Sequence, residues 1–123
     1  MYDNIIDKLQ LIKDSIGHIE EYSEKISSPD EFLLSPGGML RLDACVMRLQ
    51  VIGESVKSIL STKNNPLGYA PEIPWKKIVA LRNIISHEYI SIDEELIYNI
   101  IKDDLPQLKA AVETIILRLE TEE

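Results

Sequence analysis

The fold of this chain is decided by residues 39–60, which read MLRLDACVMRLQVIGESVKSIL. Apolar side chains recur in this stretch at alternating spacings of three and four residues, at Leu42, Cys45, Leu49, Ile52, Val56 and Ile59. This spacing places them along one face of an α-helix and is typical of helices that pack in bundles. We therefore expect a helix from about Met39 to Leu60, with Cys45 as a small core residue.

The segment before it has the same period. From Asp3 to about Ser27 an apolar stripe is formed by Ile5, Leu9, Ile12, Ile16, Ile19 and Ile26. Residues 27–29 end this helix, and the turn-forming residues up to Pro36-Gly37-Gly38 predict a linker. Two long helices are therefore expected in the first half of the chain.

The second half begins with a loop. Residues 61–74 contain three prolines, two asparagines and Gly68. Pro74 suits the first turn of a third helix that continues to Ser86. Ser91 or Asp93 offers an N-cap for the last helical segment. Within that segment two alternatives remain open: Pro106 kinks the helix, or Asp104 caps a separate fifth helix.

No stretch shows the sustained period-two alternation of a β-strand. The sequence thus predicts one all-α domain over residues 1–123, an antiparallel bundle of four to five helices. The N-terminus lacks the basic and apolar regions of a signal peptide, and no apolar run is long enough to cross a membrane. We expect a soluble cytoplasmic protein that does not contact a membrane.

The charge balance excludes one class of function. The chain has 13 Lys and Arg against 21 Asp and Glu, a net charge of -8. Proteins that coat nucleic acid nonspecifically gain affinity from many basic contacts to phosphate, so this chain is not one of them. Any nucleic-acid chemistry would need a local pocket or a surface formed with a second chain.

The third helix contains a charged residue in an apolar stripe. Arg82 lies near the centre of a face formed by Trp75, Ile78, Val79, Ile85, Ser86 and Tyr89. An arginine there is costly to desolvate without a partner. Two readings remain open: Arg82 pairs with a glutamate such as Glu54, or it faces a cleft or a subunit interface.

His87 is the second candidate residue of this helix. It follows Arg82 by five residues, about 140° round a continuous helix, so it would turn toward Arg82 only if the helix frayed near Ser86. Asn83 lies four residues before His87 and could orient its imidazole. The alternative role for His87 is a helix cap. His18, on the first helix, has no such neighbours and is expected on the surface.

A histidine that titrates near neutrality and an arginine that binds phosphate suit RNA cleavage without a metal or a cofactor. The 2′-hydroxyl would attack the adjacent phosphate while the arginine stabilises the transition state. One histidine and one arginine make an incomplete site, because this chemistry uses an acid and a base. A symmetric dimer would complete it.

The segment Arg82-Asn83-Ile84-Ile85-Ser86-His87-Glu88-Tyr89 resembles the R-x4-H-x-Y signature of HEPN proteins. It is most similar to the HepT-like toxins of HepT/MntA toxin–antitoxin pairs. Gly53-Glu54, the residues 71–75 upstream and the residues 104–108 downstream agree with this resemblance, which covers nearly the whole chain.

The resemblance implies a homodimeric four- to five-helix bundle whose motifs line a cleft at the interface. It implies a metal-independent endoribonuclease toxin with Arg82 and His87 as the catalytic pair and Asn83 as the supporting polar residue. Tyr89 matches the tyrosine to which a nucleotidyltransferase antitoxin adds AMP. The alternative is a noncatalytic HEPN subunit that binds a nucleotide or docks a nucleotidyltransferase.

Overall fold

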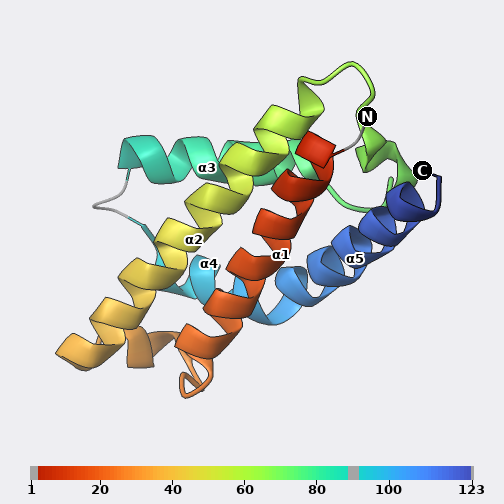
Figure 1. Ribbon diagram of the computed structural model, residues 1–123. Helices are drawn as coiled ribbons and strands as arrows, with labels where there is room; N and C mark the ends of the chain where they lie inside the picture. The colour runs from red at the N-terminus through yellow and green to blue at the C-terminus, as the bar shows by residue number, and fades with distance from the viewer. Residues whose placement is uncertain (1–2, 89–91, 123) are drawn as a thin grey trace.

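The computed structural model describes residues 3–88 and 92–122, and every regular element in these ranges is helical. Helices α1 (Asp3–Ser23) and α2 (Pro36–Leu60) lie side by side and run in opposite directions (Figure 1). Helix α5 (Leu105–Glu122) packs against α1, and α3 (Trp75–Glu88) packs on α2. The remaining elements are α4 (Glu94–Asn99), a π-helical turn, η4 (Ile100–Asp104), and two short 3-10 turns, η1 (Pro29–Phe32) and η2 (Pro66–Tyr69). The predicted all-α bundle is confirmed.

The apolar stripes meet in one core. The stripe of α1 and the stripe of α2 are buried as predicted, except that Leu42 is only partly buried. Helix α3 contributes Trp75 and Ile85, and η1 contributes Phe32. The last helical segments add Ile97, Ile101, Leu105, Leu108, Val112, Ile115, Ile116 and Leu119. Cys45 is fully buried among them, as expected for a core residue.

The two long helices differ from prediction at their ends. Helix α1 ends at Ser23, before the expected Ser27, where the Ser23 hydroxyl donates to the carbonyl of Ile19 at 2.7 Å. Helix α2 begins at Pro36 rather than Met39. The Ser35 side chain accepts a hydrogen bond from the Gly38 N–H at 3.0 Å and caps this helix. Gly37 and Gly38, which the sequence placed in a linker, therefore belong to the first turn of α2.

Trp75 anchors the loop that precedes α3. Its indole N–H is buried and donates to the carbonyls of Leu67 and Ala70 at 3.1 and 3.0 Å. The N–H groups of Lys77 and Ile78 bond to the carbonyl of Pro74, so Pro74 lies just outside the helix. The loop is thus fixed to the helix that it introduces.

A π-helical turn, η4 (Ile100–Asp104), joins α4 to α5. The Asp93 side chain caps α4 by accepting from the Glu95 N–H at 2.9 Å, while Ser91 lies outside the described residues. The chain changes direction at η4 (Figure 1). Because Pro106 has no N–H and its ring excludes the carbonyl four residues earlier, the wider turn lets the helix continue. The kink alternative holds, and Asp104 lies inside the turn rather than at a cap.

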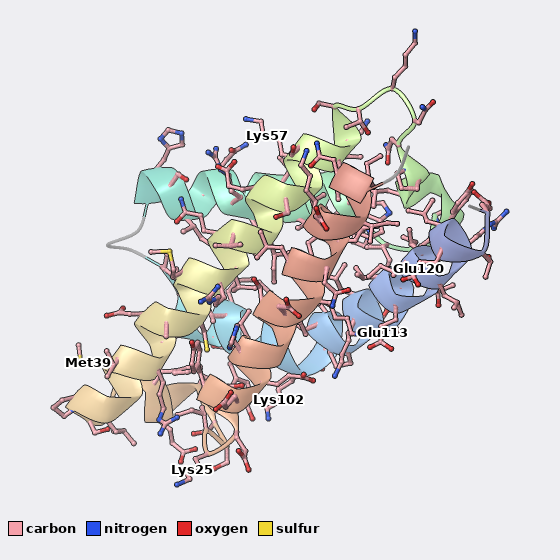
Figure 2. The ribbon with its side chains drawn as sticks, in the orientation of Figure 1. Lys25, Met39, Lys57, Lys102, Glu113 and Glu120 are labelled. Atoms are coloured by element: carbon pink, nitrogen blue, oxygen red, sulfur yellow. The ribbon has the colours of Figure 1, made fainter. Side chains whose placement is uncertain are left out.

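Part of α2 remains apolar and exposed. Met39, Leu40 and Met47 are 52%, 70% and 60% exposed, and Figure 2 shows Met39 near the start of the helix, at the outer end of the bundle. Within the described residues, no helix has the length and apolar character needed to cross a membrane.

Candidate active site on helix α3

Helix α3 crosses α2 at Gly53, and this contact places Arg82. A methyl group on Gly53 would lie 2.4 Å from Cβ of Arg82, 3.1 Å from its Cγ and 3.3 Å from the Ile78 carbonyl oxygen. Ordinary carbon contacts are about 3.5 to 4.0 Å, so no larger residue fits here without movement. The glycine lets the stem of Arg82 lie directly against the backbone of α2.

The guanidinium of Arg82 is held from two sides. Nη2 forms an ion pair with Glu54 of α2, and Nη1 donates to Oδ1 of Asn83 at 2.9 Å. Nε is buried and has no hydrogen-bond partner among the described residues. Arginine has five N–H donors, so one N–H on each Nη nitrogen remains after these contacts. The ion pair with Glu54 proposed from sequence is present, and among the described residues N–H donors of the kind that bind phosphate are left without a partner.

In the described part of α3, the expected contact between the Asn83 side chain and the His87 imidazole is not present. The oxygen of Asn83 bonds to Arg82, so this oxygen does not orient the imidazole. Helix α3 is unbroken past Ser86, and His87 is exposed in its last turn. The five-residue separation therefore keeps Arg82 and His87 about 140° apart round the helix. In one chain the two side chains therefore leave the helix in different directions.

A second polar contact, which the sequence did not reveal, links the same helices. Nε2 of Gln50 donates to the Ser86 hydroxyl at 3.1 Å. Gln50 and Glu54 are four residues apart on α2, and their partners Ser86 and Arg82 are four apart on α3. The matching spacing is the signal that could have found this contact, because residues four apart share a helix face.

Tyr89, the expected site of AMP addition, lies outside the described residues. His18 is exposed, as expected, and stacks on Tyr22 with ring centroids 6.0 Å apart.

Burial raises the pKa of the Cys45 thiol to about 11, with a smaller opposing effect from Arg41. The cysteine is therefore a core residue and takes no part in the site.

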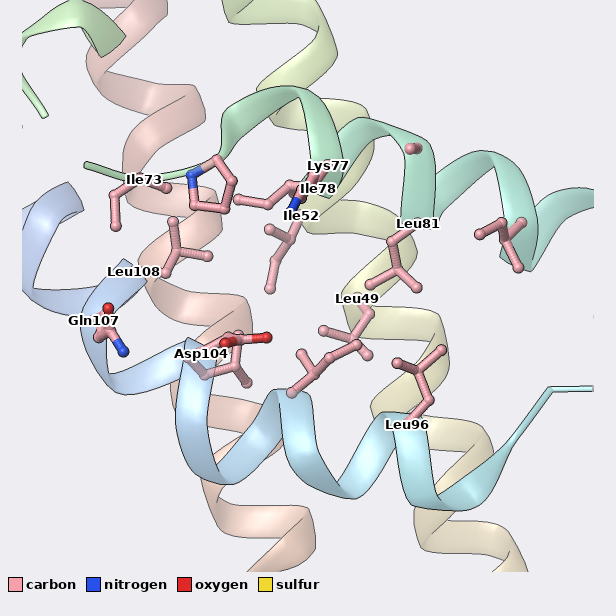
Figure 3. Close-up of a pocket in the computed structure, with 15 residues that line it drawn as sticks. Leu49, Ile52, Ile73, Lys77, Ile78, Leu81, Leu96, Asp104, Gln107 and Leu108 are labelled. Atoms are coloured by element: carbon pink, nitrogen blue, oxygen red, sulfur yellow. The ribbon is translucent and has the colours of Figure 1, made fainter. Parts of the chain in front are cut away.

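A mostly apolar groove lies elsewhere on α3. It has a volume of about 450 Å³ and runs between α3 and the segment from α4 to α5 (Figure 3). Its lining is mostly apolar, with Lys77, Asp104 and Gln107 as its polar side chains. Arg82, Asn83 and His87 do not line it. The groove and the R-x4-H residues are thus separate features of α3.

Comparison with known proteins identifies the family of the chain. The family described as "Ribonuclease HepT-like" matches residues 12–115. The chain is 35% identical over 104 residues to "Putative RNase MJ1380" of Methanocaldococcus jannaschii, covering 85% of this chain and 89% of the relative. It is 31% identical over 109 residues to "Probable ribonuclease HepT" of Thermococcus cleftensis, covering 89% and 93%.

A third relative is longer. The chain is 31% identical over 112 residues to "Gamma-glutamylcyclotransferase and putative RNase MJ0434" of Methanocaldococcus jannaschii. This match covers 91% of the chain and 47% of that protein. No solved structure gives a significant match. The chain is a helical bundle, and the family model matches most of its length, so it is a HEPN-type domain. The chain belongs to the HepT-like ribonuclease family.

Proposed function

We propose that the protein is a metal-independent endoribonuclease that acts as the toxin of a toxin–antitoxin pair. The observation that carries the proposal is Arg82, which is fixed against α2, keeps N–H donors for a phosphate and lies five residues before an exposed His87. The membership of the chain in a ribonuclease family supports the same chemistry.

In the proposed reaction a histidine removes the proton of a ribose 2′-hydroxyl, and the 2′-oxygen attacks the adjacent phosphorus. Arg82 stabilises the negative charge that builds up on the phosphate oxygens. The bond from phosphorus to the 5′-oxygen breaks, and a second acid donates a proton to that oxygen. The products are a 2′,3′-cyclic phosphate and a 5′-hydroxyl, so neither an oxidant nor water is consumed in this step.

A homodimer would complete the site. Since Arg82 and His87 diverge within one chain, a twofold axis near this end of α3 would bring an arginine of one copy near a histidine of the other. The exposed Met47 supports this position, because it lines a surface hollow together with Gln50 and Ser86. The dimer would then hold two composite sites, each with an arginine from one copy and a histidine from the other, and water would serve as the second acid.

The experiment is RNA cleavage by the purified protein in EDTA. Wild type should cleave, whereas Arg82→Ala and His87→Ala should lose activity by about 100-fold or more. Arg118→Ala and His18→Ala are matched controls, since both residues are exposed and lie on other helices. Equal inactivity of wild type and variants would favour the noncatalytic docking subunit. Equal activity would exclude Arg82 and His87 as catalytic residues.

We further propose that a nucleotidyltransferase antitoxin blocks the site by adding AMP to Tyr89. Tyr89 follows Arg82 by seven residues, a spacing that on a continuing helix puts both on one face. With ATP, Mg²⁺ and the partner enzyme, wild type should gain mass in AMP units, and Tyr89→Phe should not. Unchanged modification of Tyr89→Phe would assign the acceptor to another residue.

A further inference from the structure

Glu54 is an acidic residue paired with the arginine that we propose binds phosphate. It comes from α2, whereas Arg82, Asn83 and His87 all come from α3. Its side chain is 48% exposed and that of Arg82 is 23% exposed. A half-exposed ion pair contributes little to folding. A carboxylate beside a phosphate-binding arginine also repels RNA, so the presence of this pair calls for a role in the site itself.

The contacts of Arg82 indicate that role. Its stem is fixed where Cβ and Cγ lie against Gly53, but the guanidinium beyond can still rotate. Asn83 holds one Nη nitrogen from the same helix, and Nε has no partner among the described residues. Glu54 supplies the second point of attachment, from a different helix. Two attachment points, one on each Nη, define the plane and the direction of the guanidinium.

We propose that Glu54 is a positioning residue, which orients Arg82 for phosphate through its oxygen and weakens RNA binding through its charge. This inference rests on the proposed ribonuclease function. The two effects act on different constants: the loss of orientation lowers kcat, and the loss of charge lowers the dissociation constant of RNA. Loss of a merely structural ion pair would leave kcat unchanged in the folded protein.

The test compares Glu54→Ala with Glu54→Gln, because the amide keeps an oxygen at the same position without the charge. Glu113→Gln on α5 is the control for the loss of one exposed carboxylate; Figure 2 labels its position. Turnover is measured on an RNA oligonucleotide that wild type cleaves. Binding is measured with the same oligonucleotide carrying a 2′-deoxy residue at the cleavage site, which removes the nucleophile.

We expect Glu54→Ala to lower kcat by about 10- to 100-fold, the range for a misplaced catalytic group. Glu54→Gln should restore most of this loss and bind the 2′-deoxy RNA about three-fold more tightly, as removal of one charge at about 6 Å in water predicts. The tighter binding should shrink as salt is raised. Wild-type kcat in Glu54→Ala, or equal loss in both variants, would overturn the proposal.

A second readout does not depend on activity. In ¹⁵N NMR spectra of the full chain, the side-chain N–H signals of Arg82 should show restricted rotation in wild type and in Glu54→Gln, and rapid rotation in Glu54→Ala. If wild type cleaves no RNA, the proposed function fails while this measurement still decides whether Glu54 orients Arg82. Equal mobility in wild type and Glu54→Ala would refute the positioning role.

Discussion

Replacement of Gly53 by alanine tests how closely α3 must approach α2. The added methyl would lie 2.4 Å from Cβ of Arg82, about 1 Å inside the ordinary contact distance. Neither atom belongs to a flexible side-chain end, so α3 must move away from α2 at the crossing. Overpacking of this kind costs about 1–3 kcal/mol.

Helix propensity acts in the opposite direction. Alanine is better than glycine inside a helix by about 0.8–1.0 kcal/mol, so the net loss of unfolding free energy should be about 0–2 kcal/mol. Gly17→Ala is the matched control, because Gly17 is an exposed residue of α1 with no atom within 4 Å of the added methyl. Gly17→Ala should therefore gain the full benefit of alanine over glycine, about 0.8–1.0 kcal/mol of unfolding free energy. The two variants should therefore differ by about 1–3 kcal/mol.

Urea unfolding followed by helical circular dichroism measures this difference, with an unchanged m value showing that the denatured state is the same. The shift of α3 should also separate Arg82 from Glu54, so Gly53→Ala should cleave RNA more slowly, by up to about 100-fold. A Gly53→Ala variant as stable as Gly17→Ala would refute the close approach and the account of how Arg82 is placed.

Three further predictions concern the scaffold. Because Cys45 is buried and its pKa is raised to about 11, it should react with Ellman's reagent at pH 7 only after unfolding; rapid reaction of the native protein would contradict its burial. Hydrogen bonds from the Ser27 hydroxyl and N–H lower the pKa of Glu31, so its contribution to stability is present above the ordinary glutamate pKa and lost as pH falls through the lowered value. Glu31→Gln should thus lower the Tm at pH 7, and the difference from wild type should shrink in acid; a constant difference would exclude this linkage. Trp75→Phe removes the indole N–H from two carbonyls and should lower the unfolding free energy by about 1–3 kcal/mol in urea titrations, whereas an unchanged value would mean that these bonds do not anchor the loop.

The sequence predicted the helices well because their stripes are long and regular. Leu9, Ile12, Ile16 and Ile19 are all fully buried, as the period of α1 required. Helix ends were predicted less well, since they depend on single hydrogen bonds such as that from the Gly38 N–H to Ser35. The π-helical turn before Pro106 has no periodic signature, and sequence gave only the choice between a kink and a break.

The candidate site was predicted in part. Arg82 and Glu54 could be paired from sequence because a charge in an apolar stripe needs a partner. The bond from Arg82 to Asn83 could not be predicted, because neighbouring residues on a helix usually point apart. The unbroken α3 also removed the possibility that His87 swings toward Arg82. We therefore propose that catalysis by Arg82 and His87 requires two chains.

That requirement gives the most direct test. Arg82→Ala and His87→Ala chains with different tags are coexpressed, and the mixed dimer is isolated by both tags and assayed for RNA cleavage in EDTA. If Arg82 of one copy works with His87 of the other, this mixed dimer should recover about half of the wild-type activity, since one composite site of two remains. A dimer of wild type and the double variant should be inactive by the same reasoning. An inactive mixed dimer beside an active wild-type and double-variant dimer would contradict the account.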